Sequence, residues 1–331
     1  MKKNILLGLA LIVSAGFAYA QGNVSTVTST GSGNAANVSQ TGLTNVADIT
    51  QNGDNNTGNQ TQNGTSNEAY IDQSQTGNQS SQTQSGLSNF AQSWQTYYAD
   101  NNQSIQMQSG TDNDAITESW LGQNNRNYQT QEGISLWAVS SLGNGNSNNS
   151  NQYQFGEQND AWIFANGNSN WATQYQNSSN NFEIVQQVGN NNGSYQVQWS
   201  GDWNRNYASQ EGNGNFLEQY ALGGNNTNDA VQIGNGNRAD QLQGWKRNYN
   251  ADGEFTGHEL IGPSDFNNAE VDQTGDGNSA NQAQIGIGSH LAKTLQEGTS
   301  NFSYSQQDGN NHNSNVTQIG ADNSAFVYQN N

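Results

Sequence analysis

Cysteine is absent from this chain of 331 residues, and proline occurs once, at Pro263. Without cysteine there are no disulfide bonds and no thiolate metal sites, so packing and hydrogen bonding must hold the fold together. Hydrophobic residues make up only 31% of the chain, which is below the share found in an ordinary globular domain. A conventional enzyme built around a large apolar core is therefore not expected.

Charge is also scarce, because only 11% of the residues are charged. The 8 basic residues are outnumbered by 27 acidic ones, and the resulting net charge of −19 argues against nucleic acid as a partner. Asparagine, glutamine, serine and glycine supply most of the polar residues, and this composition differs from that of highly charged disordered chains. We expect such a chain to become ordered through repetition.

The first twenty residues differ from the rest of the sequence. Lys2 and Lys3 precede an apolar run over residues 5–13, and small residues follow up to Ala20. This pattern predicts a secretory signal peptide over residues 1–20, with a secreted, extracellular product that passes through the periplasm. The alternative is a membrane anchor, but the run is short for a bilayer, and we expect a protein that is not membrane-embedded. Loss of both lysines would change the net charge from −19 to −21.

An 11-residue repeat fills the remaining sequence, residues 21–331. The copy from Gln40 to Gln51 has the form QxGxxNxAxxxQ, and the next copies begin at Gln51 and Gln62. The asparagine position recurs from Asn23 to Asn323 in 27 copies, of which 23 keep asparagine. The exceptions are Asp100, Leu136, Ser289 and His312. Repetition at a fixed short period is typical of solenoid architectures.

Each copy predicts one strand and one tight turn. Residues 45–51 alternate with period two, and the next four residues contain the glycine. The fifth strand position alternates between small or apolar residues and glutamine, as in Ile49, Gln60, Ile71 and Gln82. The structural unit is therefore about 22 residues with two unlike strands. We predict an all-β fold, a two-sheet parallel β-solenoid of cross-β type with strand–turn–strand rungs stacked at ~4.7 Å.

In such a stack, equivalent side chains lie above one another, so asparagine and glutamine amides can form ladders in place of an apolar core. The predicted stacking ladders contain Asn45, Gln51, Asn56, Gln62, Asn67, Gln73, Asn89, Gln95, Asn159, Asn170, Gln176, Gln187, Asn192, Gln198, Asn237, Gln243, Asn278, Gln284, Asn323 and Gln329. The predicted turn glycines are Gly42, Gly53, Gly64, Gly86, Gly156, Gly189, Gly234, Gly275 and Gly320. These glycines supply backbone conformations that other residues avoid.

Most aromatic residues have the opposite parity and are expected to point outward. Tyr70, Phe90 and Trp94 are examples. Two interpretations remain open. Aromatic residues favour strands and can stack on the exterior of the column, or they can form a contact surface for neighbouring fibrils or carbohydrate.

The ends of the repeat region carry no atypical copy that would cap the strand edges. The first strand is expected to begin at Asn23 and the last to end at Gln329. A column whose ladder is exposed at both ends can add further copies of itself end to end, so we expect a homopolymer.

The pattern from Gln40 to Gln51 resembles the curlin repeat of curli, the secreted functional amyloid of bacterial biofilms, and the similarity extends over nearly all of residues 21–331. The resemblance implies a self-assembling structural subunit of extracellular fibres for biofilm matrix and surface adhesion. It also implies an outer-membrane export channel and a nucleator as partners. Two alternatives stay open: a monomeric surface β-solenoid adhesin or nucleator of such fibres, and an ice-binding solenoid.

The repeat is interrupted near residues 249–266. The spacing from Asn248 to Asn267 is 19 residues, Pro263 lies between them, and the glutamine alternation changes phase. An irregular strand over residues 256–262 would restore that phase. Asn248, Asn250, Asp252 and Glu259 have nearly the spacing of a calcium-binding loop, although an Asp-Gly turn explains the same residues.

No group of residues predicts catalysis. His258, His290 and His312 are isolated in the sequence and have no HxH or HExxH spacing. The acidic residues are spread over a repetitive exterior, and no pair stands out as an acid and base. We therefore expect a protein that is not an enzyme and needs no cofactor.

Overall fold

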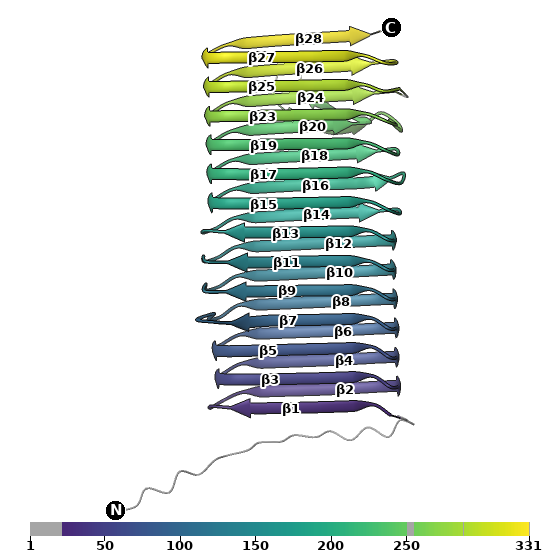
Figure 1. Ribbon diagram of the computed structural model, residues 1–331, viewed down its shortest axis with the longest axis vertical. Helices are drawn as coiled ribbons and strands as arrows, with labels where there is room; N and C mark the ends of the chain where they lie inside the picture. The colour runs from purple at the N-terminus through teal and green to yellow at the C-terminus, as the bar shows by residue number, and fades with distance from the viewer. Residues whose placement is uncertain (1–21, 250–254, 287, 331) are drawn as a thin grey trace, which may run out of the picture.

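The computed structural model describes residues 22–249, 255–286 and 288–330, and this part of the chain consists of β-strands and turns without any helix. Two parallel sheets of 13 strands each face one another and form a column, and a third sheet has two strands. Figure 1 shows the strands stacked along the column, with the N-terminal end at the bottom and the C-terminal end at the top. The predicted two-sheet parallel β-solenoid is therefore confirmed.

The strands of the two large sheets alternate along the sequence. The first sheet contains β1 (Val24–Thr30), β3 (Val46–Asp54), β5 (Glu68–Thr76), β7 (Phe90–Thr96), β9 (Asp114–Trp120), β11 (Trp137–Gly143), β13 (Asp160–Asn166), β15 (Phe182–Asn190), β17 (Arg205–Asn213), β19 (Thr227–Asn235), β23 (Asn268–Asp276), β25 (Leu291–Thr299) and β27 (Asn313–Ala321). The second sheet contains β2 (Ala35–Leu43), β4 (Thr57–Thr65), β6 (Gln79–Leu87), β8 (Gln103–Thr111), β10 (Arg126–Ile134), β12 (Asn149–Glu157), β14 (Trp171–Asn177), β16 (Gly193–Ser200), β18 (Phe216–Leu222), β20 (Arg238–Gln243), β24 (Ser279–Ile285), β26 (Phe302–Asp308) and β28 (Ser324–Asn330).

Equivalent residues of successive rungs are in register. Ala47 lies opposite Ala69, and Gln51 lies opposite Gln73, 22 residues later in the sequence. Because the sheets are parallel and in register, each repeat position forms a line of side chains parallel to the axis of the column.

The interior of the column lies between the two sheets and is mixed in polarity. The first sheet contributes small and apolar side chains such as Ala47 and Ile49, while the second contributes glutamines such as Gln60, and all of these are buried. A continuous apolar cluster extends through the C-terminal half and includes Ile163, Val185 and Leu217. Alternation with period two places the remaining strand residues on the outer faces, as the sequence pattern predicts.

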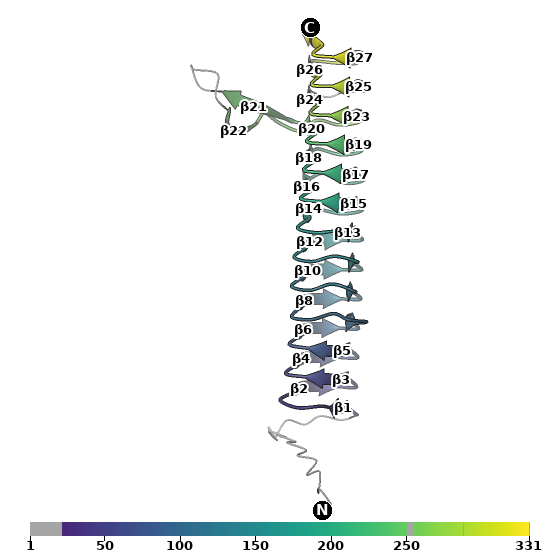
Figure 2. The same cartoon turned by 90° about the vertical axis from the view of Figure 1, so that its left-hand side faces the viewer.

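An antiparallel hairpin interrupts the column between β20 and β23. It consists of β21 (Trp245–Tyr249) and β22 (Phe255–Leu260), and Figure 2 shows it projecting sideways from the second sheet. Asn248 lies opposite Gly257 in this hairpin and therefore occupies no repeat position, which corrects the sequence-based assignment. When Asn248 is not counted as a repeat copy, the fifth strand position is Gln241, then Val271, then Gln282. The alternation of glutamine with small or apolar residues therefore continues without a change of phase. The strand predicted over residues 256–262 overlaps β22 but adds no rung.

Two other repeat positions also differ from the predicted ones. Asn102 rather than Asp100 occupies the asparagine position, because its backbone amide donates to Asn78 Oδ1 and its own Oδ1 accepts from the Asn125 amide. Similarly, His290 rather than Ser289 is equivalent to Asn267, since the His290 amide donates to Asn267 Oδ1. In both cases residues inserted in the preceding turn shift the position away from the simple spacing.

Candidate functional site: amide ladders and strand edges

The asparagine ladder lies at the turns and joins each rung to the next. The Asn67 backbone amide donates to Asn45 Oδ1 at 3.0 Å, and Asn67 Oδ1 accepts the Asn89 amide at the same distance. Asn67 Nδ2 donates to the carbonyl of Gly86, the turn glycine one rung later, at 3.1 Å. Each asparagine thus satisfies backbone groups of the turn that would otherwise be buried without partners.

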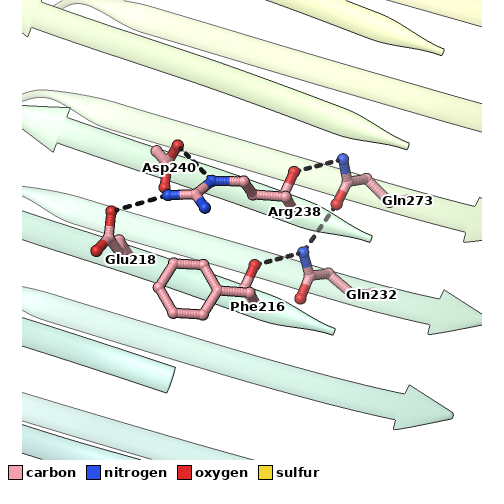
Figure 3. A network of polar contacts seen from close by, with 6 residues as sticks. All are labelled: Phe216, Glu218, Gln232, Arg238, Asp240 and Gln273. Atoms are coloured by element: carbon pink, nitrogen blue, oxygen red, sulfur yellow. Dashed lines mark hydrogen bonds and ion pairs between the residues drawn. The ribbon is translucent and has the colours of Figure 1, made fainter. Parts of the chain in front are cut away.

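The glutamine ladders lie inside the column and connect rungs as well as sheets. Gln232 Nε2 donates to Gln273 Oε1 at 2.9 Å in the next rung and to the Phe216 carbonyl at 3.1 Å in the facing sheet. Figure 3 shows that Gln273 repeats this pattern with the Arg238 carbonyl, at 2.9 Å. Because residues 232 and 273 flank the hairpin, the ladder continues across the insertion.

Every residue of the predicted ladders bonds to an equivalent residue in a neighbouring rung. Asn323 and Gln329, in the last rung, bond on one side only within the described residues. A further ladder starts at Gln60 and continues through Gln82 to Gln241 and Gln282. In the sequence, this ladder is indicated by the glutamine that alternates with small or apolar residues at the fifth strand position. The ladders thus satisfy most buried amides beside the apolar cluster, while the Oε1 atoms of Gln51, Gln60, Gln187 and Gln243 have no hydrogen-bond partner among the described residues.

Most of the turn glycines pack against a glycine of the next rung, although Gly53 faces Gln75 and Gly156 faces Ser178. Gly189 has a φ of 119°, and a Cβ at this position would lie 1.9 Å from the Gly212 carbonyl oxygen. All of the predicted turn glycines have positive φ: Gly42, Gly53, Gly64, Gly86, Gly156, Gly189, Gly234, Gly275 and Gly320. At Gly189, therefore, both the backbone conformation and the close approach of the next rung require glycine.

The edges of the column carry matching inward side chains. β28 presents Ala325, Val327 and Gln329, and β2, at the opposite end of the same sheet, presents Ala36, Val38 and Gln40. Within the described residues, β2 pairs only with β4, and β28 pairs only with β26. Each edge strand therefore has one row of backbone groups without a neighbouring strand there.

The other sheet has a similar pair of edges. β27 presents Ser314, Val316 and Gln318 inward, while β1 presents Ser25, Val27 and Ser29 in the same order. Two of the three positions are identical. At the fifth position of the second sheet, the first and last strands have valine, whereas the strands from β4 to β24 have glutamine.

Glu183 is a buried carboxyl group that the sequence analysis did not single out. Its side chain points inward at the position that Ala161 occupies in the neighbouring rung, and it is completely buried. Asn206 Nδ2 donates to Glu183 Oε1 at 3.2 Å, and no described group is hydrogen-bonded to Oε2. Desolvation raises the pKa of Glu183 well above its ordinary value, and the bond from Asn206 offsets this only in part. The sequence could have indicated this group, because glutamate replaces the repeat alanine at position 183.

We predict that Glu183→Gln raises the free energy of unfolding at pH 7 by about 1–3 kcal/mol. Because the pKa of Glu183 is raised in the fold, its contribution is fully present below the unfolded value near 4.5 and is lost as pH rises towards the folded value. Glutamine keeps the acceptor for Asn206 without the charge. Urea unfolding at pH 4 and pH 7 measures the difference, with Glu132→Gln on the exposed surface as the control. An equal gain at both pH values would contradict the assignment.

His290 and His312 are not isolated in space, which corrects the interpretation of their sequence spacing. Their rings stack with centroids 5.3 Å apart in successive rungs. His290 Nδ1 accepts the His312 backbone amide at 3.2 Å, and His290 Nε2 lies 3.0 Å from the Gly309 carbonyl. These contacts suit a neutral His290 ring, and desolvation is the main cause that lowers its pKa. The pair therefore continues the asparagine ladder with imidazole rings.

An ionic cluster lies on β20, next to the hairpin. Arg238 contacts Asp240 at 3.4 Å and Glu218 at 3.5 Å, and its guanidinium lies 4.6 Å from the centre of the Phe216 ring. Asp240 is buried although it faces outward, and Trp245 of the hairpin packs against Tyr220 at 5.6 Å. The cluster thus joins β18 to β20, the strand from which the hairpin leaves the column.

Two of the four residues with calcium-loop spacing belong to the described ranges. Asn250 and Asp252 lie outside the described residues, while Asn248 and Glu259 are on opposite strands of the hairpin. In the described ranges, no three histidine, aspartate or glutamate side chains are grouped to hold a metal ion. These ranges also contain no helix that is long and apolar enough to cross a membrane.

Comparison with known proteins identifies no family: no family model matches the chain, and no curated protein matches it.

Proposed function

We propose that this protein is a self-assembling structural subunit of extracellular, curli-like amyloid fibres. The observation that carries the proposal is the match between the two ends of the column, where β28 and β2 present alanine, valine and glutamine in the same order. Stacking the C-terminal end of one copy on the N-terminal end of another places like residues above like residues. The same arrangement occurs inside the column, as in Ala47 on Ala69 and Gln51 on Gln73.

The contact joins two different ends of the molecule, so it leaves a free edge after each addition. A heterologous contact that does not close on itself produces an open filament. Each addition would also extend the backbone ladders of both sheets and lengthen the glutamine row that ends at Gln329. Growth therefore repeats, between subunits, the hydrogen bonding that connects rungs within one subunit.

The resemblance to the curlin repeat supports an extracellular location for this assembly. It favours a secreted protein that reaches the cell surface through the periplasm and an outer-membrane export channel, with a nucleator to start growth. The fibres would then contribute to biofilm matrix and surface adhesion. In this proposal the chain acts through its surface and its ends, without a catalytic centre.

Negative-stain electron microscopy of purified residues 21–331, incubated at micromolar concentration, tests the proposal. We expect unbranched filaments in the images. Fibre diffraction from the same filaments should contain the strand spacing of ~4.7 Å along the fibre axis. Single rods roughly 60 Å long that do not grow would contradict it. That result would favour the monomeric adhesin or nucleator instead.

A further inference from the structure

The outer face of the first sheet contains a groove beside the enlarged turn after β7. The groove has a volume of about 750 Å³ and is lined by Trp94, Tyr97, Tyr98 and Trp120 together with Asp72 and neighbouring polar residues. Trp94 lies opposite Asp72 on the adjacent strand, and the Tyr97 and Trp120 rings are 6.5 Å apart. We call this feature the aromatic groove.

The groove exists because the repeat is broken at this point. Residues 97–102 connect β7 to β8, whereas two residues, 55–56, connect β3 to β4. The longer connection places Tyr97 and Tyr98 on the surface, where they are 69% and 73% exposed. Both have left-handed backbones, with φ values of 56° and 66°, as turn residues along the column have, among them Ser66, Ser135 and Trp203.

The chemistry of the lining suits a sugar chain. Aromatic side chains offer apolar surface to the C–H groups of a sugar ring, while the amides of Asn52 and Gln75 can bond to its hydroxyl groups. The lining has a carboxylate, Asp72, and neither lysine nor arginine. With a net charge of −19 on the chain, an acidic sugar would be repelled and an amino sugar attracted.

We propose that the aromatic groove binds a polysaccharide strand composed of neutral or amine-bearing sugars. It lies on the side of the column, across β3, β5, β7 and β9, and away from the edges formed by β1, β2, β27 and β28. End-to-end addition therefore leaves the groove open, so a fibre would display one sugar-binding site in each subunit. This inference does not depend on the proposed assembly, because a single subunit contains the complete site.

Isothermal titration calorimetry of residues 21–331 with three soluble hexasaccharides tests the proposal. The probes are a β-1,4-linked glucose hexamer, the corresponding glucosamine hexamer and a galacturonic acid hexamer. We expect the first two to bind with one site per subunit and the acidic hexamer not to bind. Absence of heat with both the glucose and glucosamine hexamers would overturn the proposal.

Variants locate the site. Tyr98→Ala is expected to weaken binding of both sugars by about tenfold or more, since exposed aromatic anchors carry much of the energy at such sites. Trp203→Ala, at another exposed turn aromatic that is 65% exposed, should leave binding unchanged. Asp72→Asn should weaken the glucosamine hexamer more than the glucose hexamer. Equal effects of Tyr98→Ala and Trp203→Ala would contradict the location, and complete displacement of the glucosamine hexamer by tetramethylammonium would indicate a simple cation site instead.

Discussion

Gly189→Ala is expected to destabilise the column by about 3 kcal/mol or more. The added Cβ would lie 1.9 Å from the Gly212 carbonyl oxygen, and φ at this residue is 119°. Relief of the clash requires the two rungs to separate, and the asparagine above the turn then loses its acceptor, since Asn192 Nδ2 donates to Gly212 at 2.9 Å. Hydrogen exchange of the amides in β15 and β17 measures the effect locally, which suits a column whose stability is the sum of neighbouring contacts.

Gly214→Ala is the matched control for this prediction. Gly214 also has a positive φ, of 66°, but a Cβ there would meet no heavy atom within 4 Å. The control should therefore show only the cost of a left-handed alanine, about 1 kcal/mol. If the amides of β15 and β17 are equally protected from hydrogen exchange in both variants, the close stacking of turn glycines is not what the fold requires.

Val327→Lys is expected to stop filament growth while leaving the subunit folded. Val327 points inward from β28 and is half-buried, because no described strand covers it on one side. A lysine there can reach solvent in the free subunit, but a second copy stacked on β28 would bury its ammonium group without a partner. That costs about 3–5 kcal/mol, which corresponds to a reduction in affinity of at least roughly 100-fold.

The same variant should also terminate wild-type filaments. Its N-terminal edge, with Val38, is unchanged and can dock on a wild-type C-terminal edge, after which Lys replaces Val327 at the growing end. We therefore expect substoichiometric inhibition of elongation from wild-type seeds. Thr317→Lys is the control, because Thr317 is exposed and points outward from the last strand of the other sheet. Similar inhibition by both variants would show that charge alone is responsible.

Much of the fold could be predicted because its determinants are local and repeated. The alternation of residues 45–51 predicts a strand, and the change from Ile49 to Gln60 and back to Ile71 assigns successive strands to two sheets. The ladders follow from this register, since in a regular rung the residue 22 positions along lies in the same place one rung later, as Gln73 does for Gln51. Consistency between local pattern and global stacking is what made these assignments possible.

The positions that could not be predicted lie where the spacing changes. Asp100 fits an 11-residue step, but the enlarged turn moves the position to Asn102, and only the bonds to Asn78 and Asn125 reveal this. Asn248 fits the step as well, yet a hairpin removes it from the column. The aromatic groove could not be predicted for the same reason: the 22-residue period pairs Asp72 with Trp94, but only the enlarged turn brings Tyr97 next to Trp120.

Intermolecular disulfide formation tests the stacking of β28 on β2 most directly. The chain has no cysteine, so Val38→Cys with Val327→Cys introduces one pair at opposite ends of the column. In register, stacked residues of adjacent subunits would have Cα atoms about 4.8 Å apart, within the range that a disulfide bridges. Oxidised filaments should then give a ladder of covalent multimers, whereas Gln40→Cys with Val327→Cys, displaced by two residues to about 8 Å, should not. Filaments that cross-link through neither pair, or equally through both, would contradict the account.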